Sequence, residues 1–186
     1  LVALASFKPP TPQASVATSI EAVKRAVQRS EFWRFYVAGF FMAIALFVPF
    51  VFLVQYAKDQ GISSSTAAFL ITSLGVGSVI GRLGLGILGV RIGVLPLIVF
   101  CFAIQPVSYI VWLIAGSNYL LLLLFAALLG VGYGGFVALS PVAMVGIFGL
   151  EGMGGVLGGQ FSSAGFGALI GPISAGAIID ATGSFA

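Results

Sequence analysis

The sequence predicts an all-α integral membrane protein, a bundle of about five transmembrane helices. Of its 186 residues, 60% are hydrophobic and only 7% carry a charge, whereas about a quarter of the residues in a soluble domain are charged. Five apolar stretches, separated by short polar or glycine-containing links, are long enough to cross a bilayer as helices. These observations exclude a soluble globular domain, and the apolar composition also excludes a disordered chain.

The predicted spans follow one another closely along residues 35–186. The first contains no charged residue, and a helix of its length reaches roughly 34 Å at a rise of about 1.5 Å per residue. The second contains a single charge, that of Arg82. The five spans are 35–57, 64–88, 94–115, 119–147 and 156–179. Residues 35–186 are therefore expected to form one membrane domain.

Residues 1–34 are expected to form a separate segment ahead of the spans. Residues 8–13 are rich in proline, which is typical of a linker without a packed core. Apolar residues then recur on one side from Ser19 to Arg34, which predicts an amphipathic helix with Ser19 as its N-cap. The basic side chains of this helix suit an anionic membrane surface, with a regulatory site as the alternative: Lys24, Arg25, Arg29 and Arg34.

The distribution of Lys and Arg predicts the orientation, because short cytoplasmic loops are enriched in these residues. Six of them fall on one side of the predicted bundle, at positions 8, 24, 25, 29, 34 and 91, and Lys58 alone falls on the other. We therefore expect residues 1–34 and the Arg91 link to be cytoplasmic. An odd number of spans, together with a start at Leu1, leads us to interpret the chain as a piece of a longer protein.

Several kinds of site are excluded by composition. The chain has no His and a single cysteine, Cys101, which excludes a disulfide scaffold and leaves almost no ligands for zinc. Residues 84–89 and 130–135 fit the G-x-G-x-x-G pattern, but they lie inside apolar spans without the strand and acidic residue that a dinucleotide site requires. The spans contain no paired carboxylates and no Cys or Ser with a nearby base, so the sequence does not predict an enzyme. The cations are scattered along the chain, which does not predict nucleic-acid binding. We predict no metal and no cofactor.

Glycines four residues apart are the most frequent pattern in the spans. Such spacing lets helix backbones approach closely in lipid, although hinges or cavity walls are an alternative use. The pairs are Gly77 and Gly81, Gly130 and Gly134, Gly154 and Gly158, and Gly167 and Gly171. Polar residues within the spans, such as Gln160 and Ser163, are expected to form hydrogen bonds to neighbouring helices.

Arg82 is the residue that points most directly to a function. An arginine at the centre of a transmembrane helix costs about 2.5–3.5 kcal/mol on insertion scales, so it usually faces a cavity, a partner or a substrate. Ser78 lies one turn earlier on the same face, and a guanidinium pairs with a carboxylate through two parallel hydrogen bonds. The alternative is that the side chain extends about 9 Å to the cytoplasmic surface. The cavity interpretation predicts an organic anion as the ligand.

Short motifs at this point resemble a known family. The segment 86–93 resembles the G-x-L-x-D-R-x-G signature of the major facilitator superfamily, with Val90 at the position of the Asp. The segments 49–63 and 78–82 resemble one branch of this superfamily, that of the monocarboxylate and oxalate–formate transporters. Phe52 stands where many members of this branch have His, and Ser78 stands where lactate transporters have an Asp.

The resemblance implies helices seven to eleven of a twelve-helix fold, within its C-terminal six-helix half. It assigns substrate binding to Arg82 and Ser78 and, by matches in the tenth helix, to Phe136 and Ser140. The segments 171–172 and 180–185 match the end of the eleventh helix. The implied function is secondary active transport of a small organic anion at the cell membrane by alternating access, with protons as a candidate coupling ion and the missing N-terminal half as a partner. The alternatives are a carrier of a neutral solute or drug and a non-transporting membrane scaffold.

Overall fold

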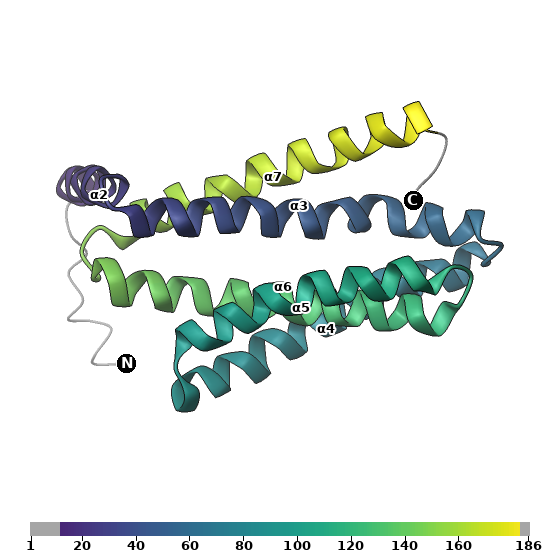
Figure 1. The fold of residues 1–186 in the computed structure, drawn as a ribbon. Helices are drawn as coiled ribbons and strands as arrows, with labels where there is room; N and C mark the ends of the chain where they lie inside the picture. Colours follow the sequence, from purple (N-terminus) through teal and green to yellow (C-terminus); the bar gives the residue numbers. More distant parts are fainter. Residues whose placement is uncertain (1–11, 183–186) are drawn as a thin grey trace.

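The computed structural model describes the backbone of residues 12–182 and the side chains of residues 19–182. Within this part of the chain the secondary structure is helical and contains no strand, which confirms the all-α prediction (Figure 1). The helices are α2 (Pro12–Val27), α3 (Ser30–Asp59), α4 (Ser64–Ile92), α5 (Val94–Ala115), α6 (Tyr119–Phe148) and α7 (Met153–Thr182). Most of the predicted proline-rich linker, residues 8–11, and the end of the 180–185 motif lie outside the described residues.

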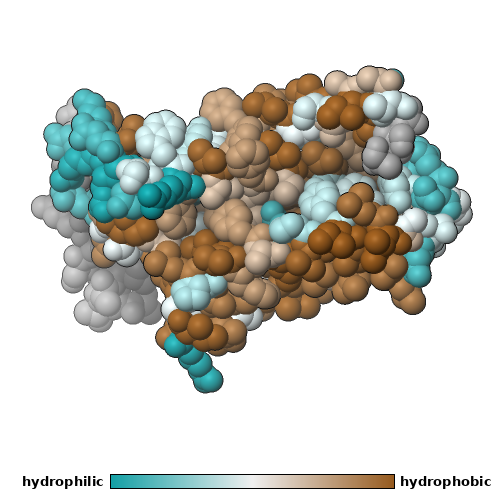
Figure 2. All heavy atoms as spheres, in the orientation of Figure 1, coloured by the Kyte–Doolittle hydropathy of each residue, from teal (hydrophilic) through white to brown (hydrophobic). Residues whose placement is uncertain are grey.

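Each helix from α3 to α7 is long and apolar enough to cross a membrane. The helices run alternately up and down, so that α3 begins, α4 ends, α6 ends and α7 begins at the same end of the bundle (Figure 1). We call this the basic end, because α2 and Arg91 lie there. On the face seen in Figure 2, hydrophobic residues predominate along the length of the bundle, and hydrophilic residues gather at its two ends. This distribution suits a protein whose sides face lipid.

Local side-chain bonds and glycines fix the helix ends. The Asn118 side chain accepts a hydrogen bond from the Leu120 backbone nitrogen at 3.1 Å, and the Ser63 hydroxyl accepts one from the Thr66 backbone nitrogen at 3.3 Å. These N-caps satisfy donors that the first turn of a helix leaves free. At the other ends of α4 and α6, Gly93 and Gly149 adopt φ values of +97° and +82°, which favour glycine.

The predicted amphipathic helix from Ser19 to Arg34 is wrong in its bounds. The helix α2 begins at Pro12, a residue type that suits the first helical turn, so Ser19 lies inside the helix and is not its N-cap. It ends at Val27, and residues 30–34 belong to α3. The break is stabilised by the Trp33 indole, which donates a hydrogen bond to the Val27 carbonyl at 2.9 Å.

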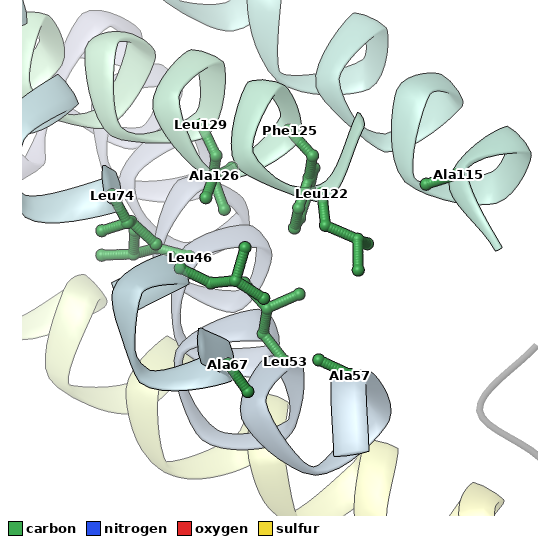
Figure 3. Close-up of a cluster of buried hydrophobic side chains, with 11 residues drawn as sticks. Leu46, Leu53, Ala57, Ala67, Leu74, Ala115, Leu122, Phe125, Ala126 and Leu129 are labelled. Carbon is green, nitrogen blue, oxygen red and sulfur yellow. The ribbon is translucent and has the colours of Figure 1, made fainter. Parts of the chain in front are cut away.

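The membrane helices form two groups that meet along the length of the bundle. The helix α6 packs against α4 and α5, and α3 packs against α7, whereas α6 and α7 touch each other only sparsely. Figure 1 shows the α3–α7 pair lying beside the group of α4, α5 and α6. The largest apolar cluster joins α3 to the second group (Figure 3): Leu46, Leu53, Ala57, Ala67, Leu70, Leu74, Ala115, Leu122, Phe125, Ala126 and Leu129. The bundle is therefore held together by α3, which contacts both groups.

Arg29 connects the turn between α2 and α3 to the end of α6. Its Nη1 donates a hydrogen bond to the Ile147 carbonyl at 3.0 Å, and its guanidinium carbon lies 5.1 Å from the centre of the Phe148 ring. Its Nη2 also donates to Glu31 Oε1 at 3.4 Å. The guanidinium thus satisfies a carbonyl that the last turn of α6 leaves free, as a cation near a helix C-terminus does.

Substitution of Arg29 by alanine is expected to loosen the end of α6. A hydrogen bond to a charged group contributes about 1.5 kcal/mol or more, so amide hydrogen exchange at residues 145–148 should rise about tenfold. Hydrogen–deuterium exchange of the protein in detergent micelles measures this change. Lys24→Ala, which also removes one positive charge from the segment, is the control. Equal exchange in the Arg29→Ala variant and the control would contradict the proposed tether.

Candidate functional site

Arg82 lies in the basic-end half of α4, and its side chain is exposed in this chain. Neither ion pair seen among the described residues involves it. Tyr133 lies on the adjacent helix α6, in the turn between Gly130 and Gly134, which pack against α4. A guanidinium and a phenolic hydroxyl on adjacent helices both donate hydrogen bonds, so together they can bind an anion.

Glycines on both helices bring α4 and α6 close together. Gly77 and Gly81 of α4 face the backbone of α6 at Ala127 and Val131, and a Cβ atom on either glycine would collide with the facing carbonyl. Gly130 and Gly134 of α6 face the backbone of α4 in the same way, at Leu74 and Ser78. The close packing predicted for these two glycine pairs is confirmed. It holds α4 and α6 nearly backbone to backbone along the turns that carry Arg82 and Tyr133.

The other two glycine pairs behave differently from each other. Gly167 and Gly171 of α7 pack against α3, where an added Cβ would come within 2.8 Å of Ala43 and 3.2 Å of Ile44, respectively. The prediction is confirmed for this pair. Gly154 and Gly158 do not pack in this way, because a Cβ on either would have no described atom within 4 Å, so they fall to the alternative use of such pairs as hinges or cavity walls. Spacing alone does not say which face of a helix meets a neighbour.

Ser78 lies behind Arg82 and away from the open surface. Its side chain is buried, and its backbone packs against Gly134 in the contact between α4 and α6. The serine therefore shares a helical face with Arg82, as its spacing predicts, but it is enclosed by α6. In this arrangement it supports the helix contact beside the guanidinium.

Phe136 and Ser140 lie one turn apart on α6 and are both buried. The Phe136 ring packs edge-on against Phe102 of α5, with ring centres 5.4 Å apart, and belongs to an apolar cluster that includes Met42 of α3. The Ser140 Oγ has no hydrogen-bond partner among the described residues. Tyr133 is partly buried and packs against the same cluster, about one turn before Phe136 on α6.

Three further residues from α3 and α7 meet Phe136 in the interior. An ideal Cβ on Gly39 of α3 would lie 2.8 Å from Ser163 Oγ, 3.0 Å from Gln160 Nε2 and 3.9 Å from Phe136 Cζ. Ser163 donates a hydrogen bond to the Gln160 carbonyl at 2.6 Å, but both polar atoms of the Gln160 side chain lack a partner among the described residues. Within the described residues, Gln160 therefore does not form the expected hydrogen bond to a neighbouring helix.

The arrangement suits reversible binding of a small polar molecule. In the described part of the chain, no three His, Cys, Asp or Glu side chains gather where they could hold a metal ion. The site residues provide hydrogen-bond donors and one positive charge, that of the Arg82 guanidinium. Such groups can orient an anion beside apolar and aromatic walls, as is usual for a small-molecule site.

Comparison with known proteins gives a consistent result. Residues 35–185 match the family model described as Major Facilitator Superfamily. Monocarboxylate transporter 4 of Gallus gallus is 32% identical over 183 residues, which cover 92% of this chain and 39% of that protein. Monocarboxylate transporter 4 of Mus musculus is 34% identical over 149 residues, covering 78% of this chain and 32% of that protein.

A fungal relative carries a less specific name. An MFS-type transporter of Gibberella moniliformis is 29% identical over 147 residues, which cover 79% of this chain and 35% of that protein. The chain thus spans only about a third of the length of these relatives. All three are named as transporters, which supports the prediction that the chain is not an enzyme.

Proposed function

The chain belongs to the major facilitator superfamily, and from this premise we propose that it forms part of a secondary transporter for small carboxylate anions. Family membership and the five apolar helices make it a multi-pass membrane protein. Two of the relatives named above are called monocarboxylate transporters, which supports a carboxylate as the substrate. Transport would occur by alternating access, in which helix groups rock around a central site.

The position of Arg82 is the main support for this proposal. Its guanidinium is exposed, lies within a membrane helix and forms no ion pair with a described carboxylate. A planar guanidinium matches the two oxygens of a carboxylate, and the Tyr133 hydroxyl on the adjacent helix α6 would add another donor. Ser78 would hold the helix contact behind the site, and Phe136 and Ser140 would line the path further inside.

The remaining parts of the proposal concern the whole protein. Residues 35–186 would supply one wall of the substrate cavity, and a further N-terminal half would supply the other. Residues 1–34 and the basic end would face the cytoplasm, because the described cations Lys24, Arg25, Arg29, Arg34 and Arg91 lie at that end of the bundle. Protons are the proposed coupling ion.

Competition between carboxylates and amides tests the substrate class. We expect the complete transporter, reconstituted in proteoliposomes, to take up a labelled monocarboxylate such as lactate. Unlabelled carboxylates should compete, and their amides should compete about a hundredfold more weakly, because they cannot accept charge-assisted hydrogen bonds from Arg82. Equal competition by acids and amides would indicate a carrier of neutral solutes. Absence of uptake for lactate, oxalate and a sugar panel would indicate a non-transporting scaffold.

A further inference from the structure

A small cavity lies at the basic end, between α2, the end of α6 and the start of α7. Its volume is about 240 Å³, below the usual range for a drug-sized ligand, so it suits a small chemical group. Arg25, Arg29 and Glu151 form a charged rim, and the Phe148 ring forms part of the wall. Figure 1 shows α2 lying at this end of the bundle, beside the start of α7.

Apolar packing beneath the cavity fixes the position of α2. Ala22, Ala26 and Val156 line the cavity, are buried, and belong to one apolar cluster with residues of α3 and α6. The helix also lies close to α7, because a Cβ on Gly155 would come within 3.0 Å of the Ser19 carbonyl oxygen. The charged rim is therefore held in place by the packing of α2 and does not depend on its own ion pairs.

Both arginines of the rim keep hydrogen-bond donors for a ligand. Arg25 Nη2 lies 4.0 Å from Glu151 Oε2, and the two side chains are 65% and 75% exposed, so this ion pair contributes little. Arg29, in the turn after α2, donates from Nη1 to the Ile147 carbonyl at 3.0 Å and from Nη2 to Glu31 at 3.4 Å. Because a guanidinium has five N–H donors, several donors on each arginine remain for another acceptor.

The charges of the rim favour a phosphate group as the ligand. Two guanidinium groups and one carboxylate, that of Glu151, line the cavity, whereas Glu31 pairs with Arg29 outside it. A phosphate group has several acceptor oxygens and up to two negative charges, so it can accept hydrogen bonds from both guanidinium groups at once. The Glu151 carboxylate reaches only Arg25 and carries one charge. A phosphate group can therefore take its place.

We propose that Arg25 and Arg29 form an anion site, separate from the transport path, which binds the phosphate group of a lipid headgroup or of a soluble ion. The site lies where the two helix groups meet at the basic end. Arg29 is bonded to the end of α6, Glu151 lies in the link that leads into α7, and α6 and α7 touch each other only sparsely. A bound phosphate group ties these two helix ends together through α2, so its occupancy regulates how freely the groups move.

Hydrogen–deuterium exchange of the complete transporter tests the site. The protein is placed in nanodiscs of phosphatidylcholine and titrated with inorganic phosphate, and chloride at the same ionic strength serves as the comparison. We expect amide exchange at residues 147–156 to fall with phosphate until the site is saturated, because the bound ion holds the link between α6 and α7 to α2. Chloride should not produce this protection. Equal exchange in the two salts would overturn the proposal.

Two substitutions in the rim should change the affinity for phosphate in opposite directions. Arg25→Ala should weaken binding at least about tenfold, because it removes hydrogen bonds from a charged donor. Glu151→Gln should tighten binding several-fold, because it removes the carboxylate that competes for Arg25. If the ion pair between these residues had only a structural role, both variants would loosen the link and neither would change the affinity for phosphate. That result would refute the site.

Lys24→Ala is the matched control for Arg25→Ala. It also removes one positive charge from the last turn of α2, but Lys24 does not line the cavity. The affinity of this variant for phosphate should stay within about twofold of that of the unsubstituted protein. An equal loss in Lys24→Ala and Arg25→Ala would indicate a general attraction of anions to a basic surface and would contradict a defined site.

Nanodiscs that contain phosphatidic acid, without inorganic phosphate, distinguish the two sources of the phosphate group. Protection of residues 147–156 that is lost in Arg25→Ala would identify a lipid headgroup as the ligand. Protection that appears only with inorganic phosphate would identify a soluble ion. Because exchange is measured without uptake, failure to transport a carboxylate would refute the proposed function and leave this site intact, and absence of phosphate binding would do the reverse.

Discussion

Substitution of Arg82 by alanine is expected to abolish carboxylate uptake by the complete transporter, with a fall in kcat/KM of at least about a hundredfold. The guanidinium is the only charged group within the predicted span 64–88, and the described fold gives it no carboxylate partner. A bound carboxylate would then lose its counter-charge in a site of low polarity. Because Arg82 is exposed and supports no described ion pair, the amount of protein in the membrane should not change.

Two other variants make this result specific. Arg82→Lys should also be impaired, because a lysine ammonium keeps the charge but cannot form two parallel hydrogen bonds with a carboxylate. Arg34→Ala, which removes a positive charge near the start of α3, should transport normally. Labelled lactate uptake at saturating and sub-saturating concentrations, with membrane abundance measured in parallel, gives the comparison. Undiminished uptake by Arg82→Ala would remove this residue from the binding site.

The fold class could be predicted because lipid imposes a strong pattern on the sequence. Charges are absent from most of each span, and the helix ends carry local signals such as Asn118 and Gly149. The break between α2 and α3 was not predicted, and the turn there is held by one local bond, from Trp33 to Val27, and by one between distant parts of the chain. The Arg29 side chain reaches the Ile147 carbonyl, 118 positions away, and no local pattern encodes that bond.

The candidate site was predictable only where a residue breaks the apolar pattern. Arg82 stands out as a lone charge in a span, but the close packing of α4 against α6 beside it becomes visible only in the structure. Gln160 is a common type of polar residue within a helix, and its lack of a partner becomes visible only when α3, α6 and α7 are packed. The equal spacing of the pairs Gly77–Gly81 and Gly154–Gly158 shows the same limit, because only the first pair faces a helix.

The contact between α4 and α6 should be the most sensitive part of the fold to a single methyl group. In Gly134→Ala the new Cβ would collide with the carbonyl of Ser78, which is backbone and cannot rotate away. The helices must separate or bend, and we expect a loss of stability of about 3 kcal/mol or more, at or above the upper end for overpacking. Thermal denaturation in detergent micelles measures this loss.

Gly84→Ala is the matched control for this substitution. Gly84 lies on α4 two residues after Arg82, and a Cβ there would meet no described atom within 4 Å. Because alanine favours a helix more than glycine does, this variant should be as stable as the original protein or slightly more stable. Gly134→Ala should also lose lactate uptake, because separating α4 from α6 displaces the part of α4 that carries Arg82. If both variants were equally stable, close backbone contact could not be what holds α4 and α6 together.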